Sequence, residues 1–264
     1  MNPARMLALG VLTLFLAASA DAIVVRHDVD DRSFTELARR FPATATFHPS
    51  SRPDDVAGMG TLIQPRWVLT AAHAAEHLKP GDLVEVAGRT HEVDVIVLHP
   101  DWRGFEPSKT YPPDIALVRL RTEERRVAVA RIPASGNEAG LEVTFVGRGS
   151  YGNGLTGPTI YSQTLRAATN RVEKAQGTAI RFRFDAPGDE GVTALEGISG
   201  EGDSGGPAYV ERNGGVYVVG VSSGQDDRPA GGKMGHYGVI EYYTRVAVYA
   251  EWIDATTSVA RPSH

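Results

Sequence analysis

The sequence contains no cysteine among its 264 residues. This absence excludes a disulfide framework, a thiolate zinc site, an iron–sulfur cluster and a cysteine nucleophile. The sequence also lacks an excess of positive charge: it has 27 Lys and Arg residues and 32 Asp and Glu residues, for a net charge of −5. A mildly acidic chain does not fit a general nucleic-acid-binding protein. A chain of this length buries about three quarters of its unfolded surface, so a stable core needs no covalent cross-link.

Long hydrophobic runs are scarce as well, and the longest lies near the N-terminus. Arg5 precedes a mainly apolar run over residues 6–18, which is shorter than the ~20 residues that span a membrane. Residues 20–22 (ADA) then give the small-x-small pattern of a signal-peptide cleavage site. We therefore predict a signal peptide over residues 1–22, with an uncut membrane anchor as the alternative. The mature protein would begin at Ile23 and be secreted, extracellular or periplasmic, without a membrane attachment.

The rest of the chain has the pattern of β-strands. Residues 91–98 (HEVDVIVL) have valine at every second position, 93, 95 and 97, which is typical of a strand with one buried face. An Asn-Gly pair at residues 213–214 separates two apolar runs and predicts a β-hairpin. Helical periodicity is clear only over residues 246–253, near the C-terminus. Further apolar runs that predict strands occupy residues 115–120, 141–146, 180–184 and 216–221.

The long uneven stretch over residues 121–141 is the best place for a boundary between two halves. We expect an N-terminal β-barrel over residues 23–130 and a C-terminal β-barrel with a final helix over residues 131–264. Short strands at regular spacing with turn residues between them favour barrels or sandwiches.

Three short segments carry residues suited to catalysis: TAAH at residues 70–73, DIAL at 114–117 and GDSGGP at 202–207. A single His or Asp is more often structural. The third segment is more specific, because a turn needs one or two glycines rather than three around one serine. Glycines allow backbone amides to converge beside the Ser204 hydroxyl, as in an oxyanion hole.

The third segment also matches G-x-S-x-G, the nucleophile elbow of α/β-hydrolases. In that class the serine leads into a helix, and Gly206-Pro207 oppose one. The acid and the histidine would also have to follow the serine, where only His236 and the terminal His264 remain. The order His73, Asp114, Ser204 is instead the triad order of chymotrypsin.

Together the three segments resemble the chymotrypsin/trypsin-like serine protease family. Other fragments fall in the same register along nearly the whole mature chain, including residues 23–24 (IV), 147–149 (GRG), 221–224 (VSSG) and 243–246 (YTRV). The signal peptide and the lack of cysteine fit an exported, bacterial-type member. The resemblance implies an all-β fold of two six-stranded antiparallel barrels, with the active site in the cleft between them and a C-terminal α-helix.

The resemblance also implies roles for individual residues. Ser204 would be the nucleophile, His73 the general base and then acid, and Asp114 the group that orients His73. The backbone amides of Gly202 and Ser204 would form the oxyanion hole.

Other residues would bind the substrate or switch the enzyme on. Ser222, Ser223 and Gly224 would pair with the substrate backbone as an added strand. The ammonium group of Ile23, freed by signal cleavage, would pair with Asp203 and order the active site.

The base of the primary substrate pocket would be Ile198, with Ser199 beside it. Either Gly238 or Glu241 would line the same pocket, the first giving an apolar pocket and the second attracting basic side chains, and the sequence leaves the two open. The acidic group Asp28, Asp30 and Asp31 fits an acidic turn better than a calcium site. We expect no cofactor or metal.

Two classes of function follow from these residues. We expect a monomeric endopeptidase that acts on protein or peptide substrates through an acyl-enzyme, and a non-proteolytic esterase would use the same groups. The alternative is an inactive homologue that binds proteins through the same cleft.

Overall fold

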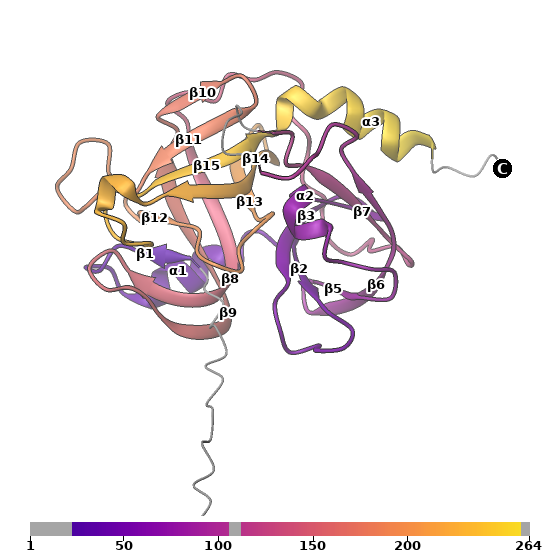
Figure 1. Ribbon diagram of the computed structural model, residues 1–264, viewed down its shortest axis with the longest axis horizontal. Coiled ribbons are helices and arrows are strands. Elements are labelled where there is room, and N and C mark those ends of the chain that lie inside the picture. Colours follow the sequence, from indigo (N-terminus) through magenta and orange to yellow (C-terminus); the bar gives the residue numbers. More distant parts are fainter. Residues whose placement is uncertain (1–22, 106–111, 260–264) are drawn as a thin grey trace, which may run out of the picture.

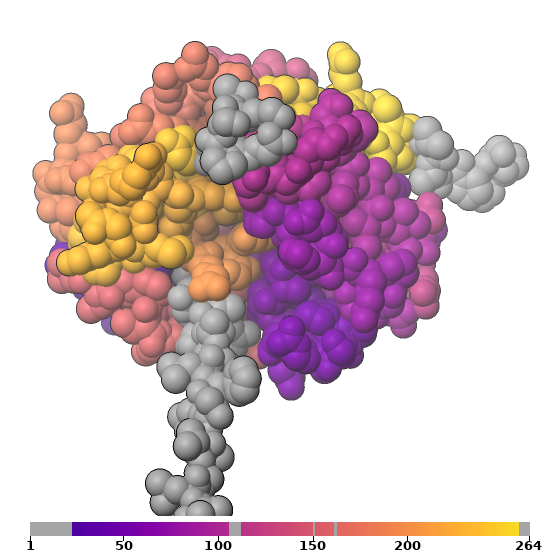
Figure 2. Space-filling view, in the orientation of Figure 1, coloured from indigo at the N-terminus to yellow at the C-terminus, as the bar shows by residue number. Residues whose placement is uncertain are grey.

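The computed structural model describes residues 23–105 and 112–259, and the predicted signal peptide lies outside them. The chain forms two β-structured halves that lie side by side (Figure 1). In the space-filling view the N-terminal half, indigo to magenta, lies on the right, and most of the C-terminal half, salmon to yellow, lies on the left (Figure 2). No helix among the described residues is long and apolar enough to cross a membrane.

The first half is a closed barrel of six antiparallel strands in the order β2-β3-β4-β7-β6-β5. Closure removes the unpaired edges of the sheet. The alternation over residues 91–98 falls in β6, as predicted. The strands are β2 (Thr44–His48), β3 (Gly58–Gln64), β4 (Trp67–Thr70), β5 (Leu83–Val86), β6 (Arg89–Leu98) and β7 (Ala116–Leu120).

The second half is a nine-stranded sheet in the order β10-β11-β15-β14-β13-β8-β1-β12, with β9 paired to β8. Six of its strands have five or more residues: β8 (Glu142–Asn153), β9 (Gly157–Arg171), β11 (Ala179–Arg183), β13 (Pro207–Arg212), β14 (Gly215–Asp226) and β15 (Ile240–Arg245). The other three are too short to show a period in the sequence: β1 (Val24–Val25), β10 (Lys174–Gln176) and β12 (Gly197–Ile198).

Each end of the chain packs against the half formed mainly by the other part of the sequence. Strand β1 pairs with β8 and β12 of the second sheet, although its residues were predicted to belong to the first barrel. Helix α1 (Asp31–Ala38) follows it and buries Phe34 in the core of the same sheet. The physical reason is that Ile23, Val25 and Phe34 find their apolar partners there.

Helix α3 (Ala250–Val259) crosses in the opposite direction and covers the first barrel (Figure 1). A 3₁₀ turn, η2 (Val246–Tyr249), leads into it, so the predicted helical segment is confirmed. Ile253 belongs to the core of the first barrel, and the Gln64 side chain donates a hydrogen bond to Thr257 Oγ1 at 2.8 Å.

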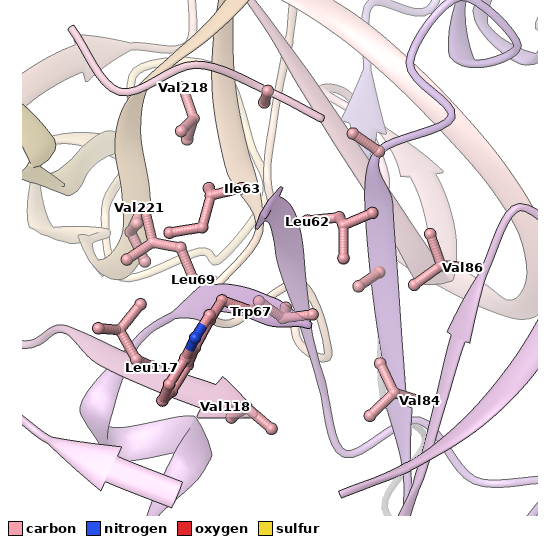
Figure 3. Packing of buried hydrophobic residues seen from close by; sticks show 14 of the residues in the cluster. Leu62, Ile63, Trp67, Leu69, Val84, Val86, Leu117, Val118, Val218 and Val221 are labelled. Carbon is pink, nitrogen blue, oxygen red and sulfur yellow. The ribbon is translucent and has the colours of Figure 1, made fainter. Parts of the chain in front are cut away.

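One apolar core runs through the first barrel and across the boundary into the second half (Figure 3). Leu62 and Leu69 of the barrel belong to the same buried cluster as Val218 and Val221 of β14. A continuous core holds the two halves in a fixed relation, which the active site requires. The hairpin at Asn213-Gly214 is also present, with both residues at positive φ and Arg212 paired to Gly215.

Candidate active site

His73 and Asp114 come together inside the first half. His73 lies on the one-turn helix α2 (Ala72–Ala75), which begins where strand β4 ends. Asp114 is fully buried just before β7, and its Oδ2 lies 2.7 Å from His73 Nδ1. The backbone amide of His73 also donates to Asp114 Oδ1 at 2.9 Å. A carboxylate acceptor at Nδ1 assigns the ring proton to that nitrogen, so Nε2 is the basic atom.

Two residues of the second half also donate hydrogen bonds to Asp114. Ser223 Oγ donates to Asp114 Oδ2 at 2.6 Å, and Thr244 Oγ1 donates to the Asp114 carbonyl at 2.8 Å. The sequence pointed to Ser223 only as part of a substrate-binding strand and did not single out Thr244. The pairing of β14 with β15 has an irregularity between Ser222 and Gly224, at the position of Ser223.

Ser204 lies in the loop between β12 and β13, pressed against the first barrel. Its carbonyl accepts a hydrogen bond from the Met59 amide at 2.8 Å. The next residue, Gly205, has φ of +80°, and a Cβ there would lie 2.1 Å from Thr70 Oγ1 and 2.6 Å from the Met59 carbonyl. Only glycine allows the serine loop to approach the barrel this closely, which explains one glycine of the GDSGGP segment.

Within the described part of the chain, no hydrogen bond joins Ser204 Oγ to His73, and the amides of Gly202 and Ser204 donate to no protein atom. Catalytic hydrogen bonds are often long without substrate and tighten only when it binds. Ser204 and Ser223 line the same cavity. Because Ser223 also donates to Asp114, the cavity that Ser204 lines borders the pair of His73 and Asp114.

Asp203, next to the nucleophile, is buried beneath the serine loop. Its Oδ2 accepts from the Gly200 amide at 3.0 Å and its Oδ1 from the Arg148 amide at 2.9 Å. A Cβ on Gly147 would lie 2.1 Å from Asp203 Oδ1, so only glycine leaves room for the carboxylate. Ile23 is also buried, in the core of the second half.

A cavity of about 310 Å³ opens beside Ser204. Four predicted substrate-binding residues line it: Ser199, Ser222, Ser223 and Gly224. Its other lining residues are Gly200, Glu201, Ser204, Gln225, Asp227 and Met234.

The expected base of the pocket differs in the structure. Ile198 is fully buried in an apolar cluster with Val24, Phe184 and Val239, because strand β12 turns its side chain into the sheet. Gly238 lies against Pro229 and Ala230 at φ of +96°. Neither residue is among the described residues that line the cavity.

Glu241 lies behind the cavity wall, not on it. Both of its oxygens accept from the Ser199 amide, at 3.2 and 3.1 Å, and Ser199 Oγ donates to Oε1. Burial raises the pKa of Glu241 to about 7, against the opposing effect of the bonds from Ser199 and Gln225.

The acidic residues near the N-terminus are paired within the protein. Asp28 binds the Arg26 guanidinium at 2.7 and 2.8 Å, and Asp31 binds that of Arg166 at 2.7 and 2.9 Å. Asp30 caps helix α1 by accepting from the Arg32 amide. These pairings explain the acidic turn, and the described residues contain no group of three side chains placed to hold a metal ion.

The fold and this geometry define a chymotrypsin-type serine hydrolase. Comparisons with known protein families, sequences and structures agree. A family model described as Trypsin matches residues 34–253. The chain belongs to the trypsin family and is a serine-type endopeptidase.

Individual relatives give the same result. The chain is 30% identical over 214 residues to chymotrypsin-like elastase family member 1 of Bos taurus, covering 74% of this chain and 76% of the relative. It is 29% identical over 224 residues to the urokinase-type plasminogen activator of Gallus gallus, covering 74% and 50%. The solved structure of neuropsin, a serine protease of mouse brain, matches its fold with a TM-score of 0.64 at 20% identity, covering 88% and 98%. These relatives are animal proteins, so the bacterial-type assignment stays a prediction.

Proposed function

We propose that the protein is an exported endopeptidase that cleaves peptide bonds through an acyl-enzyme on Ser204. The observation that supports this best is the buried Asp114, which holds His73 through Nδ1 and is itself held by Ser223 from the other half. His73 Nε2 takes the proton of the Ser204 hydroxyl as it attacks the scissile carbonyl. The same atom then protonates the leaving amine.

The remaining steps use backbone groups of the second half. The amides of Gly202 and Ser204 stabilise the oxyanion, each contributing about 3–4 kcal/mol to the transition state. The segment from Ser222 to Gly224 pairs with the backbone of a protein or peptide substrate. Asp114 stabilises the imidazolium that forms on His73.

Labelling with a fluorophosphonate tests the catalytic part. We expect covalent modification of the wild-type protein and none of Ser204→Ala, because the reagent requires an activated serine. His73→Ala should label far more slowly, since Ser204 then lacks its base. Equal labelling of the wild type and Ser204→Ala would disprove the assignment.

We propose further that signal cleavage activates the enzyme. Cleavage after Ala22 would free the amine of Ile23, whose side chain is already buried next to strand β1. The pairing of Val24 with Ile198 leads toward the loop that contains Asp203, which supports an ion pair between the Ile23 amine and that carboxylate. A mature N-terminus other than Ile23, found by intact mass, would contradict this.

The proposed ion pair predicts a loss of activity at alkaline pH. A free α-amine has a pKa of about 7.7–8.0, and pairing with Asp203 raises it in the folded protein. The stabilisation by the ion pair is complete below the pKa of the amine in the unfolded chain and disappears as the pH rises through its pKa in the folded protein. Activity should therefore fall reversibly at alkaline pH. Acetylation of the mature amine should reproduce the loss at neutral pH, and full activity after acetylation would argue against the pair.

A further inference from the structure

The cavity beside Ser204 has a buried acid behind its wall. Glu241 is fully buried, and no Lys or Arg among the described residues pairs with it. Its hydrogen bonds come from the amide and hydroxyl of Ser199 and from the side chain of Gln225. An acid held only by neutral donors would attract a cation that reached it.

Gln225 lies between this acid and the cavity. It stands directly opposite Glu241 in the pairing of β14 with β15, and it lines the cavity while Glu241 does not. Its Nε2 donates to the Ser199 carbonyl at 2.5 Å and lies 3.4 Å from Glu241 Oε1. A substrate side chain therefore meets the neutral carboxamide before the acid.

We propose that Gln225 determines the specificity of the primary pocket by covering Glu241, so that the enzyme prefers an uncharged side chain over Lys or Arg before the scissile bond. This inference rests on the proposed role of Ser204. A Lys or Arg side chain can reach Glu241 only by displacing the carboxamide, which then loses its bonds to Ser199 and Glu241. An uncharged side chain fits the cavity with those bonds intact.

Two other carboxylates line the cavity, and they do not weaken the inference. Glu201 is exposed and Asp227 is half-buried. Water and salt screen charges in such positions far more than in the interior. Both residues also remain in every variant described below, so they cannot cause a difference between variants.

Peptide cleavage by three variants tests the proposal. The variants are Gln225→Ser, Glu241→Gln and the double variant, assayed at pH 8 on peptides that differ only in Lys or Leu before the scissile bond. We expect Gln225→Ser to raise the Lys/Leu ratio of kcat/KM at least tenfold, and the double variant to return it to the wild-type value. Gln163→Ser, the same change at an exposed site, is the matched control and leaves the ratio unchanged.

A binding measurement gives an answer that does not depend on catalysis. In the Ser204→Ala background, titration with benzamidine and with its uncharged counterpart benzamide compares the two ligands directly. Gln225→Ser should strengthen benzamidine binding at least tenfold and leave benzamide binding unchanged, and the added Glu241→Gln change should abolish the gain. An unchanged benzamidine affinity, or a gain that survives Glu241→Gln, would overturn the proposal. Fluorophosphonate labelling of the wild type tests Ser204 separately.

Discussion

Two acids of the first half and two of the second have pKa values shifted in opposite directions. In the first barrel, a hydrogen bond from the Arg148 side chain lowers the pKa of Glu85, and one from the Arg126 amide lowers that of Glu124. In the second half, burial raises the pKa of both Glu196 and Glu241 to about 7. Glu85 and Glu124 each pair with an arginine, Arg148 and Arg89 respectively, whereas Glu196 and Glu241 are buried among neutral donors.

The difference matches what each half contributes to the site. The first half supplies His73, on α2, and Asp114, just before strand β7 of the closed barrel. The second half supplies the serine loop and the cavity wall, where Glu241 has no cationic partner among the described residues. The charge of Glu241 therefore depends on the pH near neutrality and on what enters the cavity.

The largest expected effect tests whether the halves act as one catalytic unit. His73→Ala and Ser204→Ala should each lower kcat by at least about 10⁴-fold, and the double variant should lose no more than the worse single variant. The reason is that neither residue, one from each half, works without the other. Burst and steady-state kinetics on one peptide substrate measure the three losses. Additive losses would mean that the halves contribute independently.

The acids of the two halves should affect the free energy of unfolding in different pH ranges. A raised pKa in the folded state means that folded Glu196 and Glu241 bind a proton that the unfolded chain has released. Their contribution therefore falls as pH rises from about 4.5 to about 7, by on the order of 3 kcal/mol each. Urea unfolding at pH 5 and pH 8 measures this loss.

Two variants assign the pH effect to one half or the other. Glu241→Gln should flatten the fall in stability between pH 5 and pH 8. Glu85→Gln should leave that fall unchanged and should instead reduce the loss of stability below about pH 4.5, because the lowered pKa of Glu85 adds stability that disappears only as the pH falls from the unfolded value through the folded one. A pH slope that is unaffected by Glu241→Gln would contradict the comparison.

The contact between the halves at Gly205 should be more sensitive than a turn within one half. Gly205→Ala places a Cβ against Thr70 and the Met59 carbonyl at positive φ, and should cost about 3 kcal/mol together with most of the activity. Gly214→Ala, also at positive φ but with open space around it, should cost only about 1 kcal/mol and leave activity intact. Thermal unfolding and peptide hydrolysis distinguish the two. Equal losses would mean that backbone conformation alone matters.

The ion pair of Arg148 with Glu85 joins the two halves. Arg148 of β8 binds Glu85 of β5 through two bonds of 2.9 Å. Arg148→Met should cost about 1–3 kcal/mol of stability, because Glu85 is then left partly buried without its cation. The exposed pair of Arg171 with Glu142, at 3.3 Å, is the control and should contribute less than about 0.5 kcal/mol. A double-mutant cycle on each pair measures the difference.

The smallest expected effect concerns reducing agents, which should act on neither half. The chain has no cysteine, so its melting temperature and activity should be the same with and without dithiothreitol. A marked loss in dithiothreitol would contradict our interpretation of the fold.

Much of the fold and the site could be predicted because the signals are local. The alternation in residues 91–98 and the Asn-Gly turn each determine structure within a few neighbouring residues. The His73, Asp114 and Ser204 segments are short motifs in a specific order. Their meeting at one place could be inferred only from the family resemblance.

The parts that could not be predicted depend on pairings distant in sequence. The irregularity at Ser223, whose hydroxyl donates to Asp114, appears only when β14 pairs with β15. Gln225 carries no motif, and its position opposite Glu241 follows from the same pairing. Ile198 was expected at the pocket base from its distance to Ser204, but the two-residue strand β12 turns it into the core.

The exchange of terminal segments ties the completion of both halves to the synthesis of nearly the whole chain. The second half needs β1, which is synthesised early, and the first barrel is covered by α3, which is synthesised late. A growing polypeptide can therefore complete neither half until nearly all of it has been made, so an unfinished chain would lack the proteolytic site.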